Sequence, residues 1–249
     1  MTMNITVFGA TGQVGAQVVA LLTAAGQDVT AASRGSGVDA VSGAGVDGAL
    51  ANAEVVVDVL NSPTMADDAA LAFFTATAAN LTAAAKRAGV GHYVLLSIVG
   101  VDQLEGGGYV RGKVVQENAV AASGVPYTIV RATQFHELTE VITGSLVVGD
   151  EARVPDALIQ PIASADVAAV LARTATERPA NGVMDLAGPE PMSFADMAAL
   201  VLAAQGKNLR VVVDPAATYF GTPVHTASLV PRGDAERAPH RLSDWLGAR

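Results

Sequence analysis

The sequence predicts an α/β protein built on a doubly wound parallel sheet, with a small C-terminal lobe. Apolar strand-like runs alternate with helical segments along most of the chain. Runs such as EVVVDVL at 54–60 are apolar enough for strands that are buried on both faces. A glycine-rich turn follows the first strand directly and leads into a helix, as in nucleotide-binding α/β units.

The hydrophobic periodicity predicts the individual elements. Strands are expected at Asn4–Phe8, Asp28–Ser33, Val55–Leu60, His92–Ser97, Tyr127–Ala132 and Val183–Leu186. Helices are expected near Gly12–Ala25, Asp67–Ala88, Tyr109–Ser123 and Ala165–Glu177. The roughly twenty residues between Arg34 and Glu54 barely fit a full helix and strand. We therefore expect a shortened crossover there, with a short third strand near Val38–Val41 or Gly45–Asp47.

The C-terminal part has a different character. Residues 133–161 hold no long periodic segment, which is typical of a substrate lobe. Ser193 and Asp196 form a capping-box start for a helix that ends at Gly206, and a strand is expected at 208–213. We predict a Rossmann-type dinucleotide-binding core at 1–133. The substrate lobe and the remaining sheet elements occupy 134–249, packed with the core as one compact unit.

Composition excludes several classes of function. The net charge of −9 argues against non-specific nucleic-acid binding, and the absence of cysteine excludes disulfides and thiol catalysis. The four histidines show no metal-ligand spacing, so no metal site is expected. The longest uncharged stretch, 69–85, is too short and polar for a membrane span. The N-terminus reads as a strand, not a signal peptide, so we expect a cytoplasmic protein that acts on a small molecule. The sequence leaves the oligomeric state open, a homo-oligomer included.

The segment 9–15 reads GATGQVG and predicts a pyrophosphate site. Gly9 allows the tight turn out of the strand, Gly12 lets the backbone meet phosphate, and Gly15 lets the helix pack closely on the sheet. The helix N-terminus supplies N–H groups to an anion. The spacing differs from the G-x-G-x-x-G fingerprint, and the alternative is an ordinary strand-to-helix turn.

The end of the second strand favours NADP(H), although NAD(H) is the other option. NAD-binding units carry an acid about 20 positions past the glycines for the ribose hydroxyls. Here the chain reads Ser33-Arg34, and Arg34 suits the charge of a 2′-phosphate while Ser33 adds a hydroxyl. The alternative is that Arg34 is a solvated loop cation.

A Y-x-x-x-K pair, Tyr109 and Lys113, is the candidate catalytic group. Residues four apart share one face of a helix. An ammonium beside the phenol would lower the pKa of Tyr109, so that the phenol gives a proton to a carbonyl oxygen as hydride arrives. Ser97 ends a strand and would hydrogen-bond the same oxygen. The alternative is that Tyr109 packs on the helix start and Lys113 is a cofactor or surface cation.

Several passages together resemble the atypical short-chain dehydrogenase/reductase superfamily, and its NmrA-like NAD(P)H-binding branch in particular. They are GATGQVG at 9–15, LLSIVGVD at 95–102, YVRGK at 109–113, SGVPYTIVRATQF at 123–135, PIASADV at 161–167 and LAGPE at 186–190. The resemblance implies cofactor contacts from Gly9, Thr11, Gly12, Gln13, Val14, Ser33, Arg34, Leu60, Asn61, Ser62, Ser97, Lys113, Ala132, Thr133 and Phe135. Phe135 and His136 follow the last core strand and are the candidate substrate residues.

The expected activity is an NADP(H)-dependent oxidoreductase that reduces a small carbonyl, imine or quinone-type substrate by hydride transfer. Members of this branch often lack the Ser-Tyr-Lys set, and some bind the cofactor without turnover. A non-catalytic NADP(H)-sensing regulator is therefore the second hypothesis, and an isomerase or epimerase the third. The presence of Tyr109 and Lys113 favours catalysis.

Overall fold

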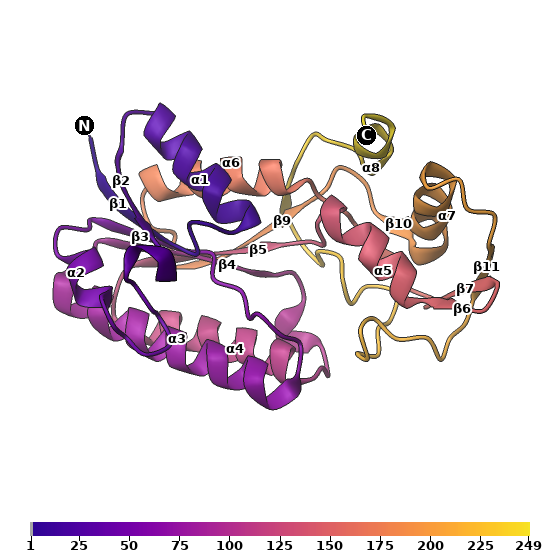
Figure 1. Ribbon diagram of the computed structural model, residues 1–249, viewed down its shortest axis with the longest axis horizontal. Coiled ribbons are helices and arrows are strands. Elements are labelled where there is room, and N and C mark those ends of the chain that lie inside the picture. The colour runs from indigo at the N-terminus through magenta and orange to yellow at the C-terminus, as the bar shows by residue number, and fades with distance from the viewer. Residues whose placement is uncertain (1) are drawn as a thin grey trace. The chain divides into compact units, whose positions relative to one another are not determined.

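The structure is a computed structural model that describes residues 2–249, and strands and helices alternate along it (Figure 1). The chain divides into two compact units, which are treated separately below. The first contains the chain up to Ser97 together with 108–130 and 167–184. The second contains 98–107, 131–166 and 185–249. The units are interleaved in the sequence, because the chain leaves and re-enters the first unit twice.

The first unit carries most of the parallel sheet. Its elements, some of which continue into the second unit, are β1 (Asn4–Phe8), α1 (Gln13–Ala24), β2 (Asp28–Ala32), α2 (Val46–Leu50), β3 (Val55–Asp58), α3 (Asp67–Ala88), β4 (His92–Ile98), α4 (Gly108–Ala122), β5 (Tyr127–Ala132), α6 (Ser164–Thr176) and β9 (Gly182–Ala187). With β12 (Ala235–Arg237), the strand order is β12-β9-β5-β4-β3-β1-β2. β1 pairs in parallel with β2 and β3, and β3 pairs in parallel with β4. The predicted α/β class and doubly wound Rossmann-type sheet are confirmed.

The predicted third strand near Val38–Val41 or Gly45–Asp47 is wrong. Asp39 turns the chain instead, because its carboxylate accepts hydrogen bonds from Val41 N and Ser42 Oγ. Asn80 on α3 donates to the carbonyls of Ala40 and Val41, which a strand would use in a ladder. The short helix α2 follows and buries Val46 and Leu50 against the sheet.

Because residues 38–47 form no strand, the sheet has a different strand order from one with a strand between β2 and β3 in the chain. The strand that follows β2 in the chain is β3, which lies on the other side of β1. The order β2-β1-β3-β4-β5 therefore reverses direction between β1 and β3. Ligands of doubly wound sheets bind at such a reversal, outside the carboxyl ends of the strands.

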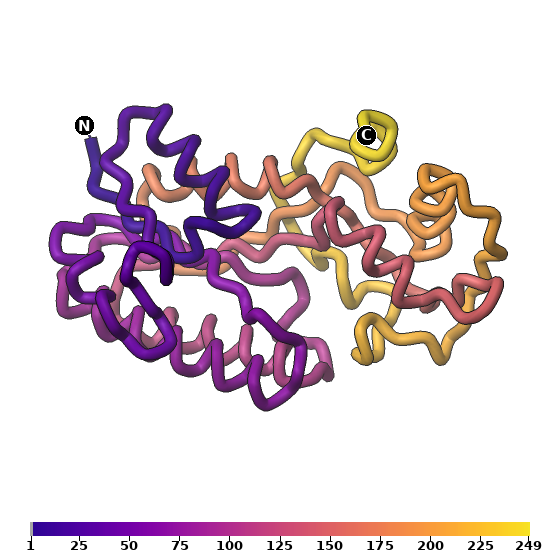
Figure 2. Tube along the Cα trace, in the orientation of Figure 1, coloured from indigo at the N-terminus to yellow at the C-terminus, as the bar shows by residue number. Residues whose placement is uncertain are grey.

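Helices cover both faces of this sheet. In Figure 1, α1 and α6 lie on one face, and α3 and α4 lie on the other. The traces of α3 and α4 run side by side (Figure 2). Two glycines of α4 allow this contact, because a Cβ on Gly108 would lie 1.8 Å from Asp67 O and a Cβ on Gly112 would lie 2.7 Å from Phe74 Cδ2. Gly108 and Gly112 therefore let α4 pack closely against α3.

The second unit is built from short elements around its own core. Its elements are α5 (Thr139–Ser145), β6 (Val147–Val148), β7 (Glu151–Val154), β8 (Leu158–Ile159), β10 (Met192–Ser193), α7 (Phe194–Ala204), β11 (Arg210–Val213), β12 and α8 (Leu242–Gly247). The predicted cap is present, since Ser193 Oγ accepts a hydrogen bond from Asp196 N at 3.0 Å. Phe194, Met197 and Val201 of α7 pack in the core of this unit. No helix within residues 2–249 combines the length and apolar character that crossing a bilayer requires.

We predict that Gly112→Val lowers the free energy of unfolding by about 2 kcal/mol, because the added methyl groups overpack against Phe74. Urea denaturation followed by circular dichroism measures the change. Gly48→Ala is the control, since a Cβ on this α2 glycine meets nothing within 4 Å and alanine gains up to about 1 kcal/mol in a helix. A Gly112→Val midpoint equal to that of the wild type would contradict the packing argument.

Candidate active site

Three neighbouring strands of the first unit end at one edge of the sheet. Gly9 follows β1, Leu60 follows β3, and Ser97 lies at the end of β4. The pairings β1–β3 and β3–β4 are parallel, so the carboxyl ends meet at this edge. The turn after β1 also touches the segment after β3, because a Cβ on Gly9 would lie 3.0 Å from Val59 O. The first unit thus gathers the N-terminal candidate residues at one place.

The glycine turn has the geometry that the sequence predicts. Gly9 has φ +84°, a conformation that favours glycine. A Cβ on Gly15 would lie 2.1 Å from Gly9 O, so only glycine lets α1 pack this close to the turn. Gly12 is the N-cap of α1 and donates its N–H to Gly9 O at 2.9 Å.

This turn fits the pyrophosphate of a dinucleotide. Thr11, Gly12 and Gln13 are exposed at the start of α1, while Val14 is buried and anchors the helix. The first turn of a helix presents N–H groups without intrahelical partners and a positive dipole end. We expect an anion at this turn to meet the Thr11 hydroxyl and the backbone at the start of α1. Val14 contributes packing beneath them.

The turn after β2 presents Arg34 to solvent. Ser33 N donates to Ser36 Oγ at 3.0 Å, and the turn closes at Gly37, which has φ +81°. Arg34 is exposed, and the nearest acid after it, Asp39, is held in its own turn. The pKa of Asp39 is lowered chiefly by the hydrogen bond from Val41 N, with a smaller contribution from the Arg34 charge. The 2′-phosphate contact of Ser33 and Arg34 stays a prediction.

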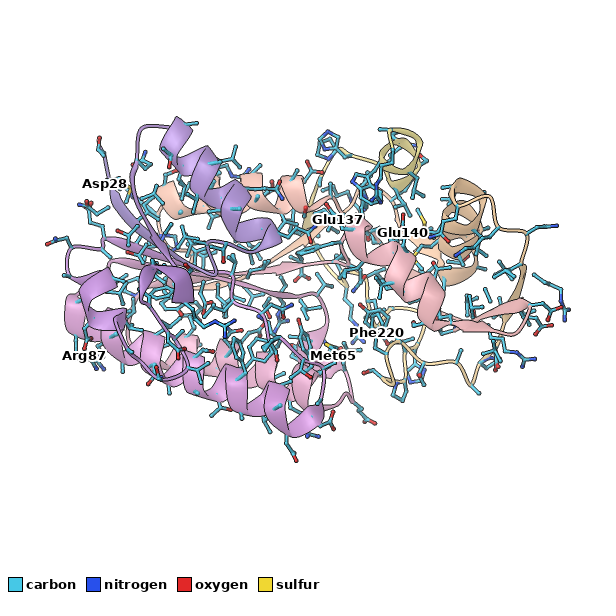
Figure 3. All side chains as sticks on the ribbon, in the orientation of Figure 1. Asp28, Met65, Arg87, Glu137, Glu140 and Phe220 are labelled. Carbon is cyan, nitrogen blue, oxygen red and sulfur yellow. The ribbon has the colours of Figure 1, made fainter. Side chains whose placement is uncertain are left out.

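The segment after β3 connects to the candidate proton donor. Asn61 Oδ1 accepts a hydrogen bond from the Tyr109 hydroxyl at 2.7 Å. Leu60 N donates to Asp58 Oδ1, which fixes the turn. Ser62 is buried, and its hydroxyl donates to Thr64 O within the same loop. Met65 follows in this loop and is exposed (Figure 3).

Tyr109 and Lys113 share one face of α4, as their spacing predicts. Both contact Phe74 of α3: the Tyr109 ring meets it edge-on at 5.3 Å, and Lys113 Nζ lies 5.0 Å from its centroid. Lys113 is buried, and Nζ donates to Leu96 O at 2.8 Å and to Gln116 Oε1 at 2.6 Å. The amine therefore lies beneath the carboxyl end of β4.

The expected lowering of the Tyr109 pKa is wrong for this structure. Burial raises the pKa of Tyr109 to about 12. The reason is geometric: the phenol donates to Asn61, whereas Lys113 Nζ is held by Leu96 O and Gln116. A phenol with a raised pKa keeps its proton and remains a hydrogen-bond donor. Its role as proton donor stays a prediction.

Ser97 has a hydroxyl without a protein partner. The residue is 3% exposed, and within residues 2–249 its Oγ has no hydrogen-bond partner. A buried hydroxyl without a partner is costly and calls for a ligand or a water. Its position at the end of β4 fits the predicted contact to cofactor or substrate.

Asp58 and Gln116 also belong to this region, although they are not among the residues predicted from the sequence. Asp58 is fully buried at the end of β3, and its Oδ2 accepts hydrogen bonds from Tyr93 OH and Gln116 Nε2, both at 2.9 Å. A signal was available, because Asp58 is the acid inside an otherwise apolar strand, and a buried carboxylate needs partners. Gln116 faces inward on α4 one turn after Lys113, so helical spacing indicates their contact.

The remaining predicted residues lie in the second unit. Thr133 N donates to Leu186 O, and Gly188 N lies 3.4 Å from Thr133 Oγ1. Ala132 O accepts from Val99 N, and Phe135 pairs with Ile162. These backbone contacts hold the segment after β5 rigidly. The cofactor contacts of Ala132, Thr133 and Phe135 stay predictions.

His136 is inside the second unit and not on its surface. The residue is 0% exposed, and its ring lies 5.8 Å from that of Trp245 on α8. Burial lowers the pKa of His136, which favours the neutral ring. Glu137 comes next in the chain, and Glu140 lies in the first turn of α5 (Figure 3). The predicted substrate contact of His136 therefore requires a path to a fully buried ring.

Within residues 2–249, the pocket described below is too small for a substrate, and no cluster of metal-ligating side chains is present. A pocket beside the Arg131–Asp102 ion pair has a volume of about 50 Å³, which suits a water and not a substrate. No group of three or more histidine, aspartate or glutamate side chains comes together as a metal site within residues 2–249.

Comparison with known proteins agrees with this geometry. A family model described as NAD(P)H-binding matches residues 9–178. The chain is 34% identical over 225 residues to a Streptomyces griseus (4-alkanoyl-5-oxo-2,5-dihydrofuran-3-yl)methyl phosphate reductase, covering 83% of this chain and 75% of the relative. This chain belongs to the NAD(P)H-binding family. The expected NAD(P)H binding is confirmed.

Solved structures share the fold of this chain. The dTDP-4-dehydrorhamnose reductase of Bacillus anthracis, in complex with NADP, aligns with a TM-score of 0.75 at 16% identity and covers 100% of this chain and 97% of its own. The Bordetella bronchiseptica enzyme WbmH, in complex with NAD⁺, aligns with a TM-score of 0.69 at 16% identity and 87% coverage of both chains. The family model and the reductase relative together identify the protein as an NAD(P)-dependent oxidoreductase.

We predict that Gly15→Ala weakens NADPH binding at least about tenfold, because its Cβ would meet Gly9 O and displace α1 from the turn. NADPH fluorescence titration measures the dissociation constant. Gly144→Ala is the matched control, since a Cβ on this α5 glycine meets nothing within 4 Å. Equal affinity in wild type and Gly15→Ala would refute the close-packing requirement.

Proposed function

We propose that this protein is an NADPH-dependent reductase that delivers hydride to a small electron-poor substrate of the carbonyl, imine or quinone class. One observation supports the proposal above all: Tyr109 and Lys113 contact the segment after β3 and the end of β4, at the sheet edge that also carries the glycine turn. Two residues with only a structural role could lie anywhere on α4, whereas a reductase requires its proton donor beside the cofactor at the carboxyl edge of the sheet.

The residues of the first unit have distinct roles in this proposal. The N–H groups of the glycine turn hold the pyrophosphate, and Arg34 with Ser33 holds the 2′-phosphate. Lys113 hydrogen-bonds the nicotinamide ribose. When bound, NADPH supplies the hydride. The Ser97 hydroxyl, which lacks a protein partner, orients the oxygen of the acceptor.

Tyr109 supplies the proton that balances the reaction. Hydride adds to the electron-poor carbon, and the phenol proton goes to the oxygen or nitrogen that gains charge. The raised pKa of Tyr109 keeps the phenol protonated over the whole working range of pH. Asn61 orients the hydroxyl before the acceptor binds. A quinone-type acceptor takes hydride directly and does not require this proton.

The relative in Streptomyces griseus supports a small, oxygen-rich acceptor. Its name describes reduction of an alkanoyl-oxo-dihydrofuran that carries a methyl phosphate. A conjugated carbonyl compound of this kind is electron-poor at carbon and falls within the predicted class. The substrate contacts of Phe135 and of the buried His136 stay predictions from the sequence. We expect this reaction to take place in the cytoplasm.

We predict that Arg34→Glu raises the dissociation constant of NADPH by at least about tenfold and leaves that of NADH within about twofold, because the change removes a cation and repels the 2′-phosphate. Fluorescence titration with both cofactors measures the effect. Arg87→Glu, at the opposite end of α3 from this edge, is the control (Figure 3). Parallel losses for NADPH and NADH would argue against a 2′-phosphate contact.

We predict that Tyr109→Phe lowers kcat for carbonyl and imine acceptors by at least about 100-fold with NADPH affinity within about twofold. NADPH oxidation is followed by absorbance against a panel of aldehydes, ketones, imines and quinones. Tyr127→Phe, at the start of β5, is the matched control. Turnover retained by Tyr109→Phe points to direct hydride transfer to a quinone. Tight NADPH binding without turnover of any acceptor by the wild type favours the sensing regulator.

A further inference from the structure

Four polar side chains form a buried cluster beneath the candidate site. Asp58 of β3, Tyr93 of β4 and Gln116 of α4 are each 0% exposed, and Lys113 of α4 is 4% exposed. Tyr93 OH and Gln116 Nε2 lie 2.9 Å from Asp58 Oδ2, and Lys113 Nζ lies 2.6 Å from Gln116 Oε1. All four belong to the first unit. The cluster therefore links the end of β3 to the candidate catalytic lysine.

With Lys113 as the ammonium, the hydrogen bonds of this cluster run in one direction. An ammonium only donates, so Gln116 accepts through Oε1. Gln116 then turns its Nε2 donor towards Asp58, whose Oδ1 also accepts from Leu60 N. Every donor around Asp58 thus suits a carboxylate that carries its negative charge.

The charges around Lys113 oppose one another. Burial lowers the pKa of Lys113 to about 8, while the carboxylates of Asp58 and Glu117 act to raise it. Burial raises the pKa of Asp58, and the Lys113 charge acts to lower it. Tyr93 and Tyr109 are the other titratable groups that face this region, and both have raised pKa values and stay neutral. The α3 neighbour of Lys113 is the apolar ring of Phe74.

The protonation state of Lys113 decides what it can offer to a ligand. A neutral amine has two N–H groups, which suffice for its bonds to Leu96 O and Gln116 Oε1. Only the ammonium has a third N–H and a positive charge. The internal bonds are therefore compatible with either state, and a nearby negative charge is needed to favour the ammonium.

We propose that Asp58 is a positioning residue of the site: it fixes Lys113 through Gln116, and its carboxylate supplies the counter-charge that keeps Lys113 protonated, so that a third N–H serves the cofactor. The role of that third N–H rests on the proposed function. The coupling between Asp58 and Lys113 does not rest on the proposed function, because it is a property of the protein without cofactor.

The chain offers a direct test because it has only three lysines, Lys86, Lys113 and Lys207. With lysine labelled by ¹³C at the ε carbon, NMR follows the titration of each amine in the protein without cofactor. Lys86 and Lys207 are exposed and serve as internal references. We expect the Lys113 titration midpoint near pH 8 in the wild type and lower by about one unit or more in Asp58→Asn, about a tenfold loss of proton affinity.

Tyr93→Phe is the matched control for this titration. It removes one hydrogen bond from the same carboxylate but leaves the charge of Asp58 and its bond to Gln116. We expect its Lys113 midpoint to stay within about 0.3 unit of the wild type. A purely structural role for Asp58 predicts that both variants lose stability and that neither moves the Lys113 midpoint, and this result would overturn the proposal.

Gln116→Met provides a second variant in case Asp58→Asn does not fold. It removes the bridge and leaves both charges, so the ammonium loses an acceptor and the Lys113 midpoint falls. An unchanged midpoint in Gln116→Met also overturns the proposal. NADPH titration at pH 7 and pH 9 then tests whether Lys113 contacts the cofactor. We expect the wild-type dissociation constant for NADPH to be higher at pH 9, because Lys113 has lost its positive charge there. A shifted Lys113 midpoint without any change in NADPH affinity supports the coupling and contradicts the Lys113 role in the proposed function.

Discussion

The close approach of α1 to the turn after β1 is the constraint on which the site depends. Only a hydrogen at position 15 fits against the Gly9 carbonyl, and only a residue without a side chain at position 9 fits against the segment after β3. This contact fixes the start of α1 beside the turn after β1, and a helix start is the part of a helix that favours an anion. The neighbouring β3 and β4 bring their own ends to the same edge because they run parallel to β1.

The buried cluster of Asp58, Tyr93, Gln116 and Lys113 meets a second requirement of this edge. A charged amine inside a protein is costly unless it is paired. The sheet supplies acceptors to Lys113 from two strands, the Leu96 carbonyl directly and Asp58 by way of Gln116. The same bonds tie α4 to the sheet. Packing and chemistry therefore depend on the same few side chains.

The two units contribute different kinds of structure to an enzyme of this family. The first is a regular sheet with long helices, and it carries the glycine turn after β1 together with Tyr109 and Lys113. The second is assembled from short strands and helices around a separate apolar core. Solved structures with the same fold bind NADP or NAD at about 16% identity.

Sequence periodicity and glycine spacing alone determined much of this protein. The bounds of β1, β5 and α3 are as predicted, because their apolar residues follow the local period of a strand or helix. The shared face of Tyr109 and Lys113 follows from helical geometry in the same way.

Three outcomes required the tertiary structure. Residues 38–47 form a turn and the start of α2 because Asn80, about 40 residues away, satisfies their carbonyls. Tyr109 has a raised pKa because the fold buries it, and its hydroxyl donates to Asn61, 48 residues away, while Lys113 donates to Leu96 O and Gln116. Asp58 lies beside Gln116, 58 residues later in the chain. Contacts of this length depend on how the chain folds back on itself, and no local pattern encodes them.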